Sequence, residues 1–111
     1  MITLKPKQQA AVFRALADPT RREILGLLRR NQDPQAVGTL AANFRISRPA
    51  ISRHLRVLRS AGLVIMLKHG ASNLCRLNPK PLQSVEHWLA DYQQFWNDSL
   101  RNLKTFVENN P

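Results

Sequence analysis

A short segment of the chain, residues 46–64, gathers guanidinium groups that no acidic side chain balances. Its arginines are Arg48, Arg53, Arg56 and Arg59. A guanidinium is permanently charged, and its planar fork of donors matches phosphate oxygens and the O6 and N7 atoms of guanine. The same segment holds serine hydroxyls and a histidine, which hydrogen-bond to anions or to backbone groups. These groups suit the binding of a polyanion.

The charge of the whole chain points in the same direction. Lys and Arg number 17 against 7 Asp and Glu, which gives a formal net charge of +10. No acidic residue occurs between Asp33 and Glu86. A long segment that carries only positive charge is typical of a surface that binds nucleic acid. A charge that served solubility alone, which is the alternative, would mix both signs.

Length and composition limit the class of protein. With 111 residues, 43% of them hydrophobic, the chain fits one folded domain over residues 1–111. The single cysteine, Cys75, excludes an intrachain disulfide and fits a reducing compartment. Residues 1–7 have no apolar run suited to a signal peptide, and the longest apolar run, residues 63–67, is too short to span a bilayer. We therefore expect a soluble, cytoplasmic protein that does not bind membranes.

Capping residues divide the first two thirds of the chain into short helices. Asp18 followed by Pro19, and Ser47 just before Pro49, are typical helix starts. Gly62 is suited to the left-handed conformation that ends many helices. The helices expected from these signals and from apolar spacing span about residues 8–17, 19–30, 38–44 and 48–61, with residues 31–35 as a loop.

The expected helix over residues 48–61 has two chemically different sides. At 100° per residue, Ile51, Leu55 and Leu58 fall within one narrow arc. A separate arc of about 140° holds the polar and basic residues Arg48, Ser52, Arg53, Arg56 and Arg59. A solvated surface helix is the alternative, but such helices usually mix Glu with Arg. Two short helices joined by a tight turn, the second basic on its outer face, indicate a helix-turn-helix.

The pattern changes after Gly62 to that of a β-hairpin. Residues 63–67 form a strand-like apolar run, a turn with Gly70 follows, and residues 73–77 form a second short strand. Such a hairpin is a wing, and Lys68, His69 and Arg76 would give it a positive edge. The predicted fold class is therefore mainly α with a small β-hairpin, a winged helix-turn-helix of about five helices and a two-stranded wing.

The rest of the chain, about residues 81–107, is predicted to be one long helix with a wide apolar stripe. Both tryptophans and the only tyrosine lie in it. One small domain does not easily cover such a stripe, so part of it is expected to meet a second copy, although packing onto the chain's own first helix alone is the alternative. The residues assigned to this interface are Leu82, Val85, Trp88, Leu89, Tyr92, Phe95, Trp96 and Leu103.

Two sequence landmarks carry a resemblance to a known family. The stretch ALADPTRREILGLL, followed by LAANFRISRPAISRHLRVLRSAGLV, resembles the ArsR/SmtB family of bacterial winged-helix repressors over about residues 8–78. The continuation LNPKPLQSVEHWLADYQQFW resembles a branch with a long, Trp-containing last helix. The resemblance implies a homodimer, joined by the first helix (with Phe13) and the last helix, that occludes a promoter. It also implies that DNA is faced by Ser47, Arg48, Pro49, Ser52, Arg53 and His54.

The roles of the individual basic residues are left partly open. Arg48 and Arg53 are the better candidates for base edges, because a guanidinium fork matches guanine. Arg56 and Arg59, with Arg21 and Arg22, are expected to be phosphate contacts or solvated charges. His54 lies at the edge of the apolar arc, where it either faces a base or satisfies a backbone or phosphate group.

The donors for a metal are sparse, so no metal and no cofactor are expected. Relatives that sense arsenic or cadmium place thiolates near the short helix before the turn, where this chain reads GTLAANFR. In the last helix, His87 and Asp91 either share a metal with Glu86 nearby or are surface side chains that pair with each other. Cys75 is expected to be a buried structural thiol. The wing of this chain departs from the family pattern at one position, because Ala71 follows the turn glycine where relatives often have Arg.

The sequence thus predicts a transcriptional regulator that binds double-stranded DNA sequence-specifically. We expect a homodimeric repressor that binds a palindromic operator and acts on its own promoter. The chain has no glycine-rich phosphate loop and no acid–base constellation, so it is not expected to be an enzyme. The alternatives are a metal-responsive repressor and a non-specific architectural protein that coats DNA.

Overall fold

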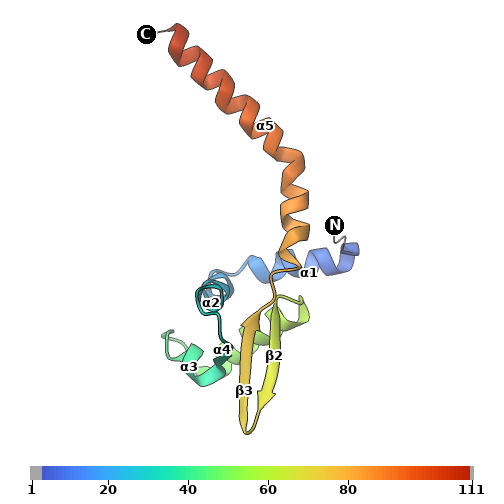
Figure 1. The fold of residues 1–111 in the computed structure, drawn as a ribbon, viewed down its shortest axis with the longest axis vertical. Coiled ribbons are helices and arrows are strands. Elements are labelled where there is room, and N and C mark those ends of the chain that lie inside the picture. Colours follow the sequence, from blue (N-terminus) through green and yellow to red (C-terminus); the bar gives the residue numbers. More distant parts are fainter. Residues whose placement is uncertain (1–3, 111) are drawn as a thin grey trace.

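The computed structural model describes residues 4–110, and Figure 1 shows their arrangement. The helices are α1 (Pro6–Leu16), α2 (Pro19–Arg30), α3 (Val37–Ala41), α4 (Arg48–Ser60) and α5 (Leu82–Asn109). The strands are β1 (Gln35–Ala36), β2 (Val64–His69) and β3 (Ser72–Leu77). The β2–β3 hairpin extends from one end of the domain, and α5 rises from the other (Figure 1). The predicted winged helix-turn-helix is confirmed.

The helix starts predicted from the sequence are confirmed at α2 and α4. The carboxylate of Asp18 accepts a hydrogen bond from the backbone N–H of Arg21 at 3.0 Å. The hydroxyl of Ser47 accepts one from the backbone N–H of Ala50 at 3.2 Å. Each bond satisfies a donor that the first turn of a helix leaves without an intrahelical partner. Helices α2 and α4 therefore begin at positions fixed by their own caps.

Gly62 ends α4 and directs the chain into the wing. Its φ of +80° lies in the left-handed region, where a side chain would be strained. The next residue, Leu63, donates its N–H to the carbonyl of Leu58 at 2.9 Å, which closes the helix end. The amide of Asn78 donates to the carbonyl of Gly62 at 2.8 Å. This bond ties the start of β2 to the end of β3.

One apolar core lies between the first four helices and the sheet. The buried side of α4 consists of Ile51, Leu55 and Leu58, as the helical spacing predicts. Because these side chains fix the rotation of α4, its basic side is held toward solvent. The other buried apolar residues are Val12, Ala15, Ile24, Leu25, Leu28, Val37, Leu40, Leu63, Val64 and Cys75.

The predicted two-stranded wing is confirmed as β2 and β3, and the sheet has a third, two-residue strand, β1, that was not predicted. The strand order is β1-β3-β2, and both pairings are antiparallel. In β1, Gln35 lies opposite Cys75 and Ala36 lies opposite Leu74. The sequence predicted a loop up to Gln35 because two residues are too few to show an alternating pattern.

Helix α3 is shorter than predicted. It ends at Ala41, although the apolar spacing suggested a helix as far as Phe44. The side-chain amide of Asn43 donates to the carbonyl of Thr39 at 3.1 Å, and this bond satisfies a carbonyl at the helix end. Residues 42–46 then form the turn that leads to α4.

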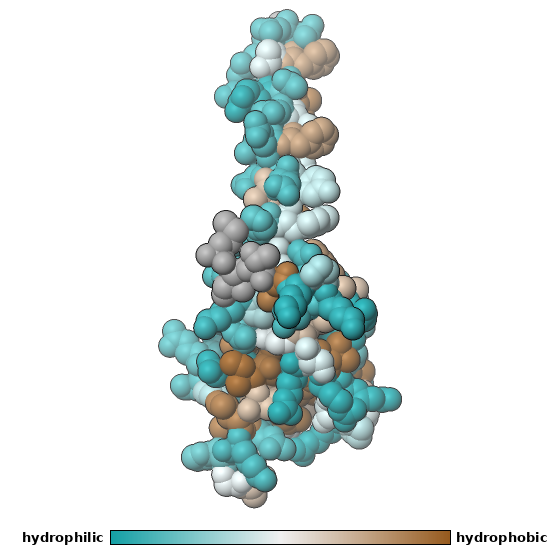
Figure 2. Space-filling view, turned by 90° about the vertical axis from the view of Figure 1, so that its right-hand side faces the viewer, coloured by the Kyte–Doolittle hydropathy of each residue, from teal (hydrophilic) through white to brown (hydrophobic). Residues whose placement is uncertain are grey.

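Helix α5 leaves the domain and gives the molecule an elongated shape (Figures 1 and 2). The molecule measures 65 × 33 × 23 Å, and its radius of gyration is 18.5 Å. A compact chain of this length would have a radius of gyration of about 13 Å. Every residue from 91 to 110 is exposed. Neither α5 nor any other helix among the described residues is long and apolar enough to cross a membrane.

Candidate nucleic-acid interface

The outer side of α4 carries a dense group of exposed positive charges. Arg48, Arg53, Arg56 and Arg59 are all exposed, as are Ser47 and Pro49 at the start of the helix, while Ser52 is half-buried. Within residues 4–110, none of these arginines forms an ion pair with a carboxylate. Their charges are therefore available to an external anion.

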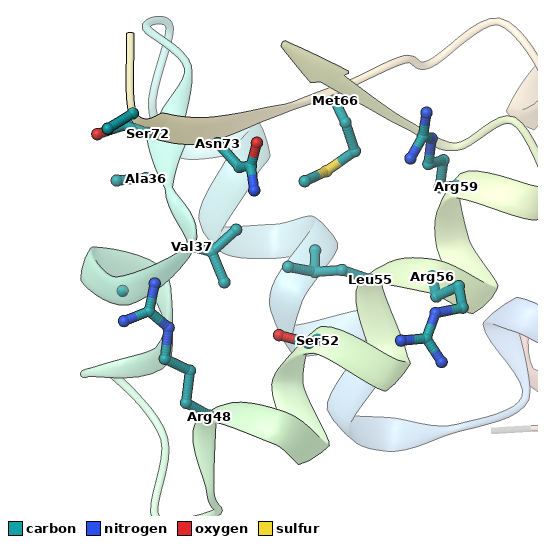
Figure 3. A pocket seen from close by; sticks show the side chains of 12 residues that line it. Ala36, Val37, Arg48, Ser52, Leu55, Arg56, Arg59, Met66, Ser72 and Asn73 are labelled. Atoms are coloured by element: carbon teal, nitrogen blue, oxygen red, sulfur yellow. The ribbon is translucent and has the colours of Figure 1, made fainter. Parts of the chain in front are cut away.

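Three of these arginines line a hollow of about 370 Å³ between α4, the start of α3 and the wing (Figure 3). Arg48 lies at one end of the hollow, and Arg56 and Arg59 lie at the other. The wing contributes Met66 and Asn73. Basic groups around a hollow concentrate positive potential there and attract an anion such as a phosphate.

Arg48 also rests against α3, a contact that the sequence analysis missed. A Cβ atom added to Gly38 would lie 3.5 Å from Nη1 of Arg48, in ordinary van der Waals contact. The guanidinium of Arg48 therefore lies beside α3, at a distance that an alanine at position 38 would also tolerate. The two residues belong to different helices of the helix-turn-helix, and no periodicity within either helix indicates that they meet.

Arg53 occupies a separate part of the basic side. It is exposed but does not line the hollow, because it lies about 140° around the helix from Arg48. Helix α4 thus presents three guanidiniums around the hollow beside the wing, and the guanidinium of Arg53 lies outside this group.

His54 faces the domain and lies next to the cap of α2. Its Nδ1 is 3.8 Å from a carboxylate oxygen of Asp18, and the two side chains are 23% and 32% exposed. The hydrogen bond from the backbone N–H of Arg21 is the main reason that the pKa of Asp18 is lowered. This carboxylate therefore stays ionised near neutral pH. A contact between His54 and DNA therefore stays a prediction, and the structure gives the imidazole an intramolecular neighbour.

Arg21 and Arg22 bind the end of α1. Nε of Arg21 donates to the carbonyl of Ala15 at 2.8 Å, and its Nη2 donates to the carbonyl of Arg14 at 2.8 Å. Nη1 of Arg22 donates to the carbonyl of Leu16 at 2.7 Å. These bonds hold both guanidiniums against the end of α1, and a phosphate contact by either residue stays a prediction.

The charged residues of the wing lie on both faces of the hairpin. Lys68, His69 and Arg76 are all exposed. Successive residues of a strand point to opposite faces, so Lys68 shares a face with Met66. His69 and Arg76 point to the other face, because Arg76 pairs with Ile65. Only Lys68 therefore lies on the face of the hairpin that looks toward the hollow.

Cys75 is the buried structural thiol that the sequence predicted. The residue is fully buried in β3, and its Sγ donates to the carbonyl of Gln35 at 3.3 Å. Burial raises the pKa of this thiol from 9.0 to about 11. A neutral, enclosed thiol is a poor nucleophile and suits a role in joining β1 to the wing.

The raised pKa of Cys75 leads to a prediction about stability at high pH. Between pH 9 and 11 the folded state keeps the thiol proton while the unfolded state loses it, so the free energy of unfolding should fall as pH rises. The fall should be at most about 1.4 kcal/mol per pH unit. Urea denaturation across this range should show it for the natural chain and less of it for Cys75→Ala. Parallel pH profiles for both proteins would contradict the prediction.

Candidate metal donors do not cluster in the described part of the chain. Among residues 4–110, no group of three or more His, Cys, Asp or Glu side chains is placed to hold a metal ion. His87 and Asp91 are both exposed on α5. The sequence suggested that His87 and Asp91 pair with each other. No ion pair between them is present among the described residues.

The residues assigned to a dimer interface fall into two groups. Near the domain, the ring of Trp88 packs edge-on against Phe13 of α1, with 5.4 Å between centroids, and Leu82, Val85 and Leu89 are half-buried. Farther along α5, the apolar side chains of Tyr92, Phe95, Trp96 and Leu103 are exposed. Packing on the chain's own α1 therefore covers only the first turns of the stripe.

Fold and site together define a winged helix-turn-helix DNA-binding protein. The model of the family described as "Bacterial regulatory protein, arsR family" matches residues 18–65, which run from the cap of α2 into β2. The chain belongs to this family. It is a transcriptional regulator and not an enzyme, as its relatives also indicate.

Two relatives match most of the chain. The HTH-type transcriptional regulator Rv2034 of Mycobacterium tuberculosis is 36% identical over 86% of this chain and 85% of its own length. The transcriptional repressor SdpR of Bacillus subtilis is 37% identical over 73% of this chain and 88% of its own length. The assignment as a transcriptional regulator therefore rests on matches that cover most of the length of each relative.

Solved structures agree with the fold. The crystal structure of an ArsR family transcriptional regulator has a TM-score of 0.75 and 36% identity, over 86% of this chain and 97% of that one. A solution structure from Mycobacterium bovis is described as a homodimeric winged helix-turn-helix DNA-binding domain. It has a TM-score of 0.63 and 27% identity, over 85% of this chain and 94% of that one.

Proposed function

We propose that this chain is a homodimeric repressor that binds a palindromic operator in double-stranded DNA and acts on its own promoter. The observation that carries the proposal is the exposed basic side of α4, whose arginines form no ion pair within the described residues. A relative named as a repressor and a structural neighbour described as a homodimer support it. Such a protein would act in the cytoplasm, where bacterial DNA lies.

The basic residues take different roles in this proposal. Arg53, and Arg48 in the first turn of α4, read base edges in the major groove, since the start of a recognition helix commonly contacts bases. Arg56 and Arg59, which share the hollow with the wing, bind phosphates. The remaining proposed DNA contacts are Ser47, Pro49, Ser52, His54, Lys68, His69 and Arg76.

The proposed dimer interface consists of α1 and α5. Phe13 and Trp88 already pack together within one protomer, and the exposed apolar side chains of α5 continue from this contact. A second copy would cover the apolar surface that one domain leaves exposed.

Footprinting on the DNA upstream of the chain's own gene tests this function. We expect one protected region with two related half-sites whose centres lie about 10 base pairs apart. Binding to that operator should be at least about 10³-fold tighter than to random DNA of equal length. Equal affinity for both DNAs would instead favour the non-specific architectural protein and contradict the proposal.

We further propose that metals do not control this repressor, because its potential donors are scattered. Stoichiometric zinc, cadmium or arsenite should neither bind tightly nor release the operator. Titration calorimetry and DNA binding with and without each ion would measure this. Zinc binding with a micromolar or lower Kd, accompanied by loss of DNA affinity, would contradict it, and His87→Ala would then be the first variant to examine.

A further inference from the structure

The hollow between α4, the start of α3 and the wing has the size of a small-molecule site. Its volume is about 370 Å³, and pockets that bind small molecules measure about 300–1,000 Å³. Its walls come from α4, from the start of α3 and from the β2–β3 hairpin, which lie far apart in the chain (Figure 3). A ligand inside this hollow would therefore touch both α4 and the wing.

Positive charge lies at the two ends of the hollow. Arg48 lies at one end, and Arg56 and Arg59 lie at the other (Figure 3). Arg56 and Arg59 follow Arg48 by 8 and 11 residues, so they lie about 12 and 16.5 Å farther along the axis of α4. None of the described residues that line the hollow is acidic. Each end can therefore bind one anionic group of a single ligand.

The middle of the hollow is apolar. Val37, Leu55 and Met66 point into it between the two basic ends (Figure 3). A phosphate is polar on every side, so it would bind a guanidinium but leave these three side chains in contact with water. A carbon chain that joins two anionic groups would cover them and remove apolar surface from water.

These features define the chemistry of the ligand. A carboxylate accepts a bidentate pair of hydrogen bonds from an arginine, so two carboxylates match the two basic ends. With hydrogen bonds of about 2.8 Å at each end, the distance from Arg48 to Arg56 leaves room for a chain of about four to six carbon atoms. Both carboxyl groups of such a molecule are ionised at neutral pH, because ordinary carboxyl groups titrate at about pH 4.

We propose that this hollow is an effector site for a short linear dicarboxylate, held between Arg48 at one end and Arg56 and Arg59 at the other, and that its occupation releases operator DNA. Binding of the dicarboxylate depends on the hollow alone. The release rests on the proposed function, in which the same guanidiniums bind DNA. A ligand that binds only the DNA-free protein shifts the population toward that state.

Titration calorimetry with adipate in the absence of DNA tests the site. We expect a Kd on the order of 0.1 mM for a ligand of this size. Arg48→Ala and Arg56→Ala should each raise that Kd by about tenfold, since each removes a charge-assisted contact. Both side chains are exposed, so the substitutions should leave the fold intact.

Two controls test whether the hollow is specific. Arg53→Ala removes the same charge from α4 outside the hollow and should bind adipate like the natural chain. Hexanoate has the same number of carbon atoms as adipate but only one carboxylate. It should bind at least about tenfold more weakly than adipate, because one basic end would stay without a partner.

Competition with operator DNA measures the release. Adipate at about ten times its Kd should raise the apparent Kd of the operator by about tenfold, as mass action requires when the two exclude each other. Sodium chloride at equal ionic strength is the control, because DNA binding itself depends on salt. In Arg48→Ala the same adipate concentration should change the apparent Kd only about twofold, since adipate binds this variant about tenfold more weakly.

The outcomes distinguish the site from the proposed function. A natural chain that binds no adipate would overturn the site, whatever its affinity for DNA. Equal weakening in Arg53→Ala, or equal binding of hexanoate, would show general attraction to the basic surface and would also overturn it. Tighter binding of pyrophosphate than of adipate would replace the dicarboxylate with a phosphate ligand and contradict the proposal.

The release can fail separately. Adipate that binds in the hollow but leaves the operator bound would overturn the release and leave the repressor function standing. A natural chain that binds adipate but no operator would overturn the proposed function together with the release, while the dicarboxylate site would stand.

Discussion

Replacing Leu89 and Trp96 together with Glu is expected to yield monomers that lose most of their affinity for operator DNA. Both side chains belong to the stripe of α5, where Trp96 is 49% exposed in the single chain. In a dimer they would be covered, and burying two carboxylates without partners is strongly unfavourable. A monomer can hold only one half-site, so we expect a loss on the order of 10² to 10⁴ in operator affinity.

Sedimentation and DNA titration of the same preparations measure this effect. Gln94→Glu combined with Thr105→Glu is a matched control, because it adds the same charge to the opposite side of α5. The control should remain dimeric and bind DNA almost normally. Circular dichroism should show equal helix content in both proteins, since the substituted side chains lie outside the core. An unchanged dimer after the Leu89 and Trp96 substitutions would contradict the proposed interface.

Local signals in the sequence were sufficient to predict most of the fold. The caps at Asp18 and Ser47 and the terminator Gly62 act over three or four residues, so they can be recognised without knowledge of distant contacts. The apolar spacing of α4 fixes which side is buried, and the basic side follows from it. The exposure of the α5 stripe was likewise foreseeable, because its width exceeds what one small domain can cover.

Several features that the sequence did not reveal depend on contacts between different elements. Strand β1 exists because Gln35 meets Cys75, which is 40 positions away. The guanidiniums of Arg21 and Arg22 turn back to α1, a choice that depends on how α1 and α2 pack. The contact of Arg48 with Gly38 depends similarly on the angle between two helices. Charge patterns locate a basic surface, but they do not assign each cation to DNA or to its own chain.

Operator binding is expected to depend steeply on salt and to separate Arg53 from Arg59. If the basic side of α4 and the wing make six to ten phosphate contacts, affinity should fall by about 10³ to 10⁵ between 50 and 200 mM salt. Arg59 lines the hollow beside the wing and is assigned to phosphate. Arg59→Ala should therefore weaken operator and random DNA about equally and reduce the salt slope by about one.

Arg53 should behave differently, because it lies apart from that hollow on the exposed side of α4. If its fork reads a guanine, Arg53→Ala should cost about 1–3 kcal/mol on the operator and little on random DNA. Arg101→Ala on α5 removes the same charge far from α4 and is the matched control, for which we expect little change on either DNA. Each variant is titrated with both DNAs across one salt series.

The pattern of losses decides what each guanidinium does. Equal losses on operator and random DNA for Arg53→Ala would reassign that residue to the phosphate backbone, while leaving α4 as the recognition helix. Full affinity in both variants would mean that this side of α4 does not face DNA, because a desolvated guanidinium–phosphate or guanidinium–guanine pair cannot be removed without cost. A loss confined to the operator for Arg53, together with a uniform loss for Arg59, would establish that one helix divides specificity and affinity between arginines on two parts of its basic side.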